Sequence, residues 1–115
     1  ELPRYAKAFD VGICPFVSNE LTRNINPIKL REYLSAGLPV VATGIPEAAF
    51  YPGACQLVEG PAAFLLACES ALGSDTRERR RERSDAMRLE TWESKTNQSL
   101  QIAVRVKNSR LGAAA

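Results

Sequence analysis

Two charged side chains, Lys29 and Glu32, lie three positions apart near the start of an expected helix. The amino end of a helix favours anions, because its first N–H groups are unpaired and its dipole is positive there. Lys29 adds a full positive charge to that first turn, which indicates a bound phosphate. The two carboxylate oxygens of Glu32 can accept hydrogen bonds from two neighbouring hydroxyls. A phosphate site beside a carboxylate that binds a diol predicts a nucleotide ligand.

The helix that carries this pair has clear start and stop signals. Asn26 is the expected N-cap and Pro27 the first helical residue, where a missing N–H costs nothing. Gly37 can adopt the left-handed conformation that ends a helix, and Pro39 prevents its continuation. The buried face is expected to hold the residues that recur with helical spacing, namely Leu30, Tyr33, Leu34 and Gly37. A short apolar strand at 40–42 follows and is expected to be covered on both faces.

A loop, a helix and a strand in this order form a unit of an open α/β sheet. Three strands are expected, at residues 10–16, 40–43 and 55–58. In such sheets ligands bind at the carboxyl ends of the strands, where loops enter the amino ends of helices. The polar loop 18–25 follows the first strand. Its side chains Thr22, Arg23 and Asn24 can therefore face a phosphate or a sugar, or simply belong to a solvated loop.

Two runs, residues 9–16 and residues 26–43, resemble the donor-binding half of GT-B glycosyltransferases of the group 1 type. The most specific part is the stretch Glu-Tyr-Leu-x-Ala-Gly-x-Pro-Val-Val-Ala-Thr at residues 32–43, and the resemblance covers residues 1–72 well. It implies an α/β fold with a partial Rossmann-like parallel sheet, the carboxyl-terminal part of a GT-B donor domain, followed by a long terminal helix.

The resemblance also implies roles for individual side chains. In that family the helix glutamate at the position of Glu32 binds the ribose of a nucleotide-sugar, and the preceding loop cradles the diphosphate and the sugar. Many relatives carry a first glutamate eight residues earlier, where this chain has Asn24. We expect the donor diphosphate to contact Thr22, Arg23, Ile28 and Lys29. We expect the donor sugar to contact Glu20 and Asn24.

The chain opens with Glu1 rather than Met, so we interpret it as the carboxyl-terminal fragment of a glycosyltransferase. The whole enzyme would bind a nucleotide-diphosphate sugar and transfer the sugar to an acceptor held by an amino-terminal domain outside this chain. The resemblance implies no metal ion, and no cofactor is expected besides the donor substrate. Two alternatives remain open: a nucleotide-sugar epimerase of the same architecture, and a degenerate, non-catalytic nucleotide-binding remnant.

Composition narrows the class of protein further. The 115 residues allow one modest domain, and the net charge of +2 argues for no particular partner. No apolar run reaches the roughly 18 residues that a membrane-spanning helix needs, which leaves only a peripheral membrane contact of the parent protein open. The absence of histidine excludes a histidine general base. Three widely spaced cysteines form no metal-ligand pattern and fit a reduced, cytoplasmic setting.

We expect three parts: a partial nucleotide-sugar-binding α/β domain at residues 1–73, a terminal amphipathic helix region at 74–110 and a disordered tail at 111–115. A helix that begins at Gly60-Pro61 should bury Phe64, Leu65, Cys68, Ala71 and Leu72. Residues 75–78 resemble a capping box at the start of a long polar helix, with the acidic Asp75 as the cap in place of Ser or Thr. The arginines of this helix alternate with Glu78 and Glu82, which favours a solvated helix face over a nucleic-acid surface.

Overall fold

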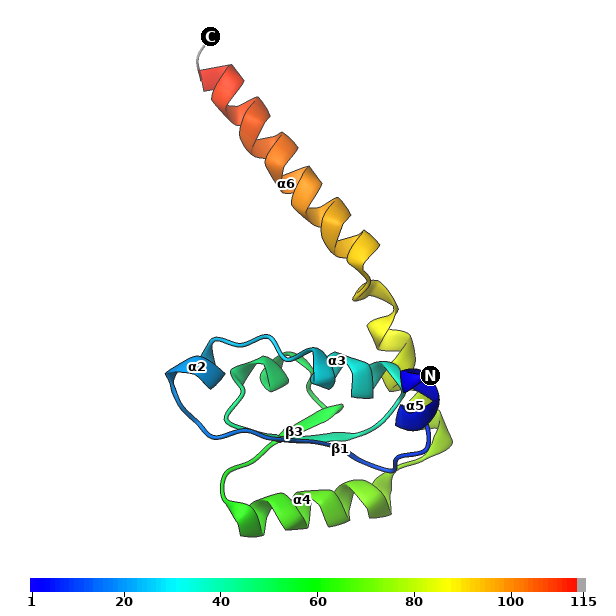
Figure 1. Ribbon diagram of the computed structural model, residues 1–115. Coiled ribbons are helices and arrows are strands. Elements are labelled where there is room, and N and C mark those ends of the chain that lie inside the picture. The colour runs from blue at the N-terminus through cyan, green and yellow to red at the C-terminus, as the bar shows by residue number, and fades with distance from the viewer. Residues whose placement is uncertain (114–115) are drawn as a thin grey trace.

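The computed structural model describes residues 1–113, which form one three-stranded parallel sheet flanked by helices (Figure 1). The strands lie in the order β1 (Gly12–Pro15), β2 (Val40–Thr43) and β3 (Cys55–Leu57). Gly12 lies opposite Val40, and Val40 lies opposite Cys55. Helix α3 (Ile28–Ser35) covers one face of the sheet and α4 (Pro61–Ser74) covers the other. The predicted α/β class, with a partial Rossmann-like sheet and a long terminal helix, is confirmed.

The predicted core of this unit is confirmed around β2 and α3. Val40, Val41 and Ala42 are all buried, because helices cover both faces of the central strand. Leu30 and Leu34 of α3 are also buried and pack on the same side of the sheet. A strand buried on both faces can be uniformly apolar, as this one is.

The two ends of α3 differ in how well the sequence predicted them. Gly37 adopts a φ of 86°, so it ends the helix in the left-handed conformation as predicted. The predicted N-cap is wrong: Pro27 is the N-cap and has an extended backbone, with φ −74° and ψ 115°. The helix therefore begins at Ile28, and Asn26 lies one residue before the cap. The side-chain oxygen of Asn26 accepts a hydrogen bond from Arg31 instead.

The loop predicted at residues 18–25 contains a short helix, α2 (Glu20–Arg23). Asn19 caps it: its side chain accepts from the Thr22 N–H at 2.9 Å, and the Thr22 hydroxyl accepts from the Asn19 N–H at 2.9 Å. This reciprocal pair is a capping box with Thr in the fourth position. The prediction of a polar loop without a helix was wrong at these residues, because the capping box satisfies two backbone N–H donors that a loop would leave to water.

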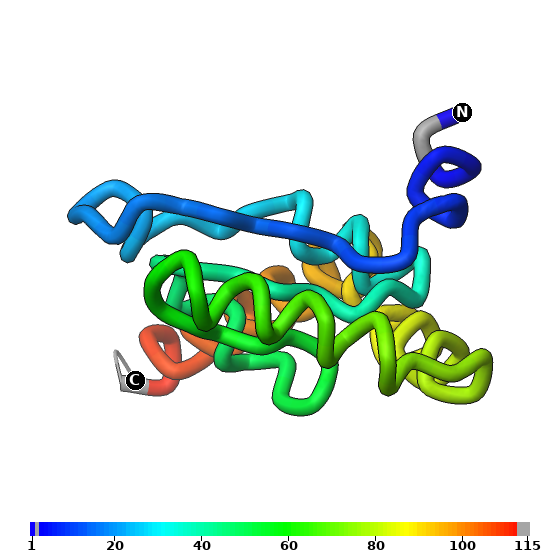
Figure 2. The backbone as a smooth tube through the Cα atoms, turned by 90° about the horizontal axis from the view of Figure 1, so that it is seen from below, coloured from blue at the N-terminus to red at the C-terminus, as the bar shows by residue number. Residues whose placement is uncertain are grey.

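Helix α4 buries a narrower face than the sequence predicted. Ala67 and Ala71 pack against Val41, whereas Leu65 and Leu72 remain 65% and 56% exposed. The reason is geometric, because α4 rests mainly on the single strand β2. In the view from below, β1 runs alongside α4 and is not covered by it (Figure 2).

The region after α4 is divided into α5 (Arg77–Ala86), the 3₁₀ turn η2 (Met87–Leu89) and α6 (Trp92–Ala113). Thr76 caps α5 by accepting from the Arg79 N–H at 3.2 Å, so the predicted cap at Asp75 is wrong. Asp75 instead accepts hydrogen bonds from Arg80 and Arg83, one on each of its two carboxylate oxygens. The boundary expected between the α/β domain and the terminal helix region, after residue 73, therefore lies close to the ion pairs that Asp75 forms with α5.

Helix α5 packs against α3, whereas α6 projects away from the rest of the molecule (Figure 1). Residues 111–113 of the expected tail belong to α6, and residues 114–115 lie outside the described residues. Two further short elements complete the fold: α1 (Leu2–Ala6) precedes β1, and the 3₁₀ turn η1 (Pro46–Phe50) follows β2. In the described part of the chain, no helix combines the length and the apolar character that a bilayer crossing requires.

Candidate functional site

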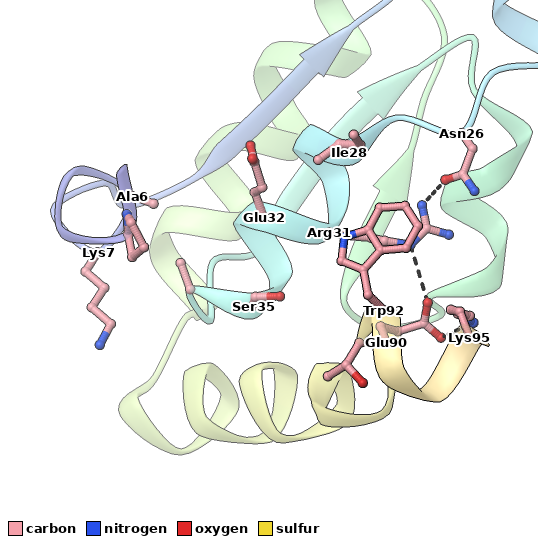
Figure 3. Close-up of a pocket in the computed structure, with 13 residues that line it drawn as sticks. Ala6, Lys7, Asn26, Ile28, Arg31, Glu32, Ser35, Glu90, Trp92 and Lys95 are labelled. Atoms are coloured by element: carbon pink, nitrogen blue, oxygen red, sulfur yellow. Dashed lines mark hydrogen bonds and ion pairs between the residues drawn. The ribbon is translucent and has the colours of Figure 1, made fainter. Parts of the chain in front are cut away.

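A cavity of about 670 Å³ lies between α1, α3 and the segment that leads into α6 (Figure 3). Its walls include Ala6 and Lys7 at the carboxyl end of α1, Ile28, Arg31, Glu32 and Ser35 from α3, and Glu90, Trp92 and Lys95 from the last segment. Ile28 and Trp92 are 66% and 86% exposed, so apolar surface stands open to solvent beside the charged groups. Such a mixture of apolar walls and a few polar groups is typical of a small-molecule site.

The predicted pair Lys29 and Glu32 is present near the amino end of α3. The Lys29 Nζ lies 3.3 Å from the Glu32 Oε2, and the two side chains are 58% and 36% exposed. Glu32 lines the cavity, so its carboxylate is accessible to a ligand. The N–H groups of Ile28 and Lys29, in the first turn of α3, have no backbone acceptor among the described residues. The anion-binding features expected of this helix end are therefore available.

Arg31 occupies the centre of a cluster that the sequence did not predict. Its Nη2 donates to the Glu47 Oε1 at 2.6 Å, and its Nε lies 3.4 Å from the Glu90 Oε2. Its guanidinium carbon lies 5.9 Å from the centre of the Tyr51 ring. Burial alone would lower the pKa of Arg31, but the hydrogen bond that it donates to Glu47 and the other nearby groups raise the pKa instead. Arg31 therefore stays charged and holds together parts of the chain that are distant in sequence.

Glu90 extends this cluster toward α6. Its second carboxylate oxygen accepts from the Lys95 Nζ at 3.0 Å. The hydrogen bond from Lys95 and then that from Arg31 lower the pKa of Glu90, although burial works against them. The carboxylate is thus ionised near neutral pH and links α3 to the first turn of α6. This link between α3 and α6 depends on a contact between segments that are distant in sequence, so no local signal in the sequence predicts the role of Glu90.

The residues predicted in the loop, Glu20, Thr22, Arg23 and Asn24, lie on α2 or at its carboxyl end and do not line this cavity. The Thr22 hydroxyl donates to the Val17 carbonyl oxygen at 2.6 Å and also takes part in the capping box. The hydroxyl has one hydrogen, which it already donates to Val17. Thr22 could therefore donate a hydrogen bond to a phosphate only if α2 rearranged. The Asn24 amide donates to the Glu20 carbonyl oxygen at 2.8 Å. The side chains of Glu20 and Arg23 are exposed.

A second cavity, of about 680 Å³, lies at the carboxyl ends of the three strands. Phe16 after β1, Thr43 and Gly44 at the end of β2, and Phe64 of α4 contribute to its walls. The Thr43 hydroxyl donates to the Phe16 carbonyl oxygen at 2.7 Å and ties the ends of two strands together. Gly44 has a φ of 66°, and a Cβ there would lie 2.9 Å from the same carbonyl oxygen. The glycine therefore lets two backbone segments approach closely at this edge.

The cysteines are apolar packing residues rather than reactive groups. Cys14 is buried in the core and Cys55 packs against the same cluster. Burial raises the pKa of the Cys55 thiol to about 12 and also raises that of Cys14. Both thiols are therefore protonated near neutral pH, and a protonated thiol is a poor nucleophile.

Comparison with known proteins identifies one informative relative. The chain is 36% identical over 97 residues to TuaH of Bacillus subtilis (strain 168), which is named as a glycosyltransferase of teichuronic acid biosynthesis. The match includes 80% of this chain and 24% of TuaH, so the chain spans about a quarter of the length of this curated relative. No protein-family model matches the chain, and no solved structure matches it.

Proposed function

We propose that this chain forms part of the donor-binding region of a glycosyltransferase of the GT-B, group 1 type. The observation that carries the proposal is the accessible Glu32 carboxylate, 3.3 Å from Lys29 in the first turns of α3. A match over 80% of the chain must include α3, so the similarity to TuaH involves this helix. The short share of TuaH that is matched supports a role as one part of a larger enzyme.

In the proposed complex, the ribose hydroxyls of a nucleotide-diphosphate sugar donate to the two oxygens of Glu32. The diphosphate lies at the amino end of α3, where the Ile28 and Lys29 N–H groups and the Lys29 ammonium are available. These groups compensate the negative charge that grows on the diphosphate as the sugar leaves. The exposed side chain of Arg23 is a further candidate for the diphosphate.

The donor sugar is proposed to lie toward α2, where Glu20 and Asn24 supply polar groups. Binding energy from the nucleotide then holds the anomeric carbon in place for attack by an acceptor hydroxyl. The acceptor would be held by a domain outside this chain. Residues outside residues 1–115 would also complete a closed site that excludes water, so that transfer is favoured over hydrolysis.

The proposal is tested by replacing Glu32 with Gln in the full-length protein. Gln is of the same size but offers one acceptor oxygen in place of two, so only one ribose hydroxyl keeps its partner. The affinity for a nucleoside diphosphate should fall by about tenfold, the effect of losing one hydrogen bond to a charged group. Isothermal titration calorimetry with uridine, guanosine and adenosine diphosphates measures this affinity.

The matched control is Glu69→Gln, which changes an exposed carboxylate on α4, across the sheet from α3. It should leave the affinity unchanged. If Glu32→Gln and Glu69→Gln bind every nucleotide as well as the unaltered protein does, then Glu32 does not bind ribose and the proposal fails.

A further inference from the structure

Arg31 draws together three segments of the chain through its guanidinium group. It donates to Asn26 before α3 and to Glu90 before α6 (Figure 3). It also donates to Glu47 in η1. Its side chain is only 23% exposed, although it carries a full charge. Two carboxylates therefore face one guanidinium, and Arg31 has no excess positive charge to offer to a phosphate.

The contact with Asn26 determines the orientation of that side chain. A guanidinium has five N–H donors and no acceptor. The atom of Asn26 that faces Arg31 must therefore be the amide oxygen. Asn26 is otherwise an exposed residue in a loop, and this contact is what restrains its side chain.

The start of α3 lacks the side-chain cap that usually holds the first turn of a helix. Pro27, at the N-cap, has no side-chain oxygen to accept a hydrogen bond, and no side-chain cap is formed. Arg31 reaches back from the second turn of α3 to the residue that precedes the cap. It thereby restrains the chain where it enters the helix and leaves the Ile28 and Lys29 N–H groups free for a ligand.

We propose that Arg31 is a positioning residue for the diphosphate of the donor, which it serves through Asn26 rather than by touching the phosphates. It keeps the first turn of α3 in the geometry that presents the Ile28 and Lys29 N–H groups to a diphosphate. Glu47 and Glu90 hold the guanidinium in place through its Nη2 and Nε atoms. This inference rests on the proposed function, because it concerns the same nucleotide site.

The test uses Arg31→Lys, Asn26→Ala and the double variant in the full-length protein. Lys keeps the charge but cannot contact three partners in one plane, as a guanidinium can. Affinities are measured by calorimetry for uridine, guanosine and adenosine diphosphates and for the three nucleosides. Each single variant should weaken diphosphate binding by about tenfold, as expected for the loss of one hydrogen bond to a charged group.

Nucleoside binding should change by less than about twofold in the same variants, because a nucleoside lacks the groups that the first turn of α3 binds. A loss of folded protein would lower both affinities alike, so the ratio of the two separates positioning from general destabilisation. The double variant should be no weaker than either single variant, because both changes remove the same contact. Additive losses, or equal losses for both ligands, would overturn the inference.

Arg88→Lys is the matched control, since Arg88 is 78% exposed and pairs only with Asp85 at 2.9 Å in the described part of the chain. It should bind diphosphates with the affinity of the unaltered protein.

If Arg31→Lys fails to fold, the result for the exposed Asn26→Ala variant alone decides the inference. Glu32→Gln separates the two proposals: if it weakens binding while Asn26→Ala does not, only the role of Arg31 is refuted. If the unaltered protein binds none of the nucleotides, the proposed function itself fails.

Discussion

The Nε of Arg83 donates to the carbonyl oxygen of Gly37 at 2.9 Å, which joins α5 to the end of α3. The carbonyl groups at the end of a helix have no partner within it, and a cation is favourable there. The side chain of Arg83 is 9% exposed and also pairs with Asp75. The polar helix α5 is therefore fixed to the α/β unit through its arginines, whereas a solvated face was expected.

Replacing Gly37 with Ala should destabilise the protein strongly. At a φ of 86°, an L side chain costs about 1–2 kcal/mol. A Cβ there would also lie 2.6 Å from the Arg80 carbonyl oxygen, so α5 would have to move, at a further cost of about 1–3 kcal/mol. Urea unfolding measures the change. Gly53→Ala is the control, because its φ is 77° with no atom within 4 Å of the added Cβ. Equal losses in both variants would show that α5 does not constrain Gly37.

Replacing Asp75 with Asn should destabilise the protein by about 3 kcal/mol, the lower end of the cost of breaking a buried ion pair. The Asp75 side chain is 7% exposed and accepts from both Arg80 and Arg83. Asn keeps one acceptor oxygen but leaves the buried Arg83 without a negative partner. Asp85→Asn, which alters a 46% exposed carboxylate on α5, should cost less than about 1 kcal/mol. The free energy of unfolding, measured in urea for both variants, distinguishes the effect of Asp75→Asn from that of Asp85→Asn.

The same ion pair should make stability depend on pH. Burial alone would raise the pKa of Asp75, but the hydrogen bonds from Arg83 and Arg80 lower it below its ordinary value of 3.8. A carboxyl whose pKa is lowered by folding stabilises the folded state above its unfolded pKa, and loses that effect as the pH falls through the folded value. The stability difference between the unaltered protein and Asp75→Asn should therefore be full above about pH 5 and shrink as the pH falls below 3.8. A difference that stays constant on acidification would contradict this cause of the pKa shift.

Lys29→Ala should weaken nucleoside diphosphate binding by about threefold to fivefold, a modest effect because the side chain is 58% exposed. Nucleoside binding should hardly change, since the ammonium is proposed to face the phosphates. The free energy of unfolding should change by less than about 0.5 kcal/mol, because an exposed ion pair contributes little. Lys107→Ala on α6 is the control with a remote lysine. A loss of the same size for nucleoside and diphosphate would show that Lys29 does not sense the phosphates.

The sequence alone determined the central unit of the fold. Pro39 and Gly37 predicted where α3 ends, and the helical spacing of Leu30 and Leu34 predicted its buried face. The run at 40–42 predicted a strand that is buried on both sides. These predictions succeed because each signal is local: a proline or glycine restricts the backbone at its own position, and periodicity is a property of neighbouring residues.

Only the tertiary structure decided which charged side chains act structurally. Composition suggests that Arg83 is solvated, yet it is buried because Asp75 and the carbonyl of Gly37, 46 positions away, satisfy its donors. Arg31 looks like any polar residue of a helix until Glu90, 59 positions later, lies beside it. A charge can be buried only where partners compensate the loss of hydration, and those partners are brought together by folding rather than by sequence spacing.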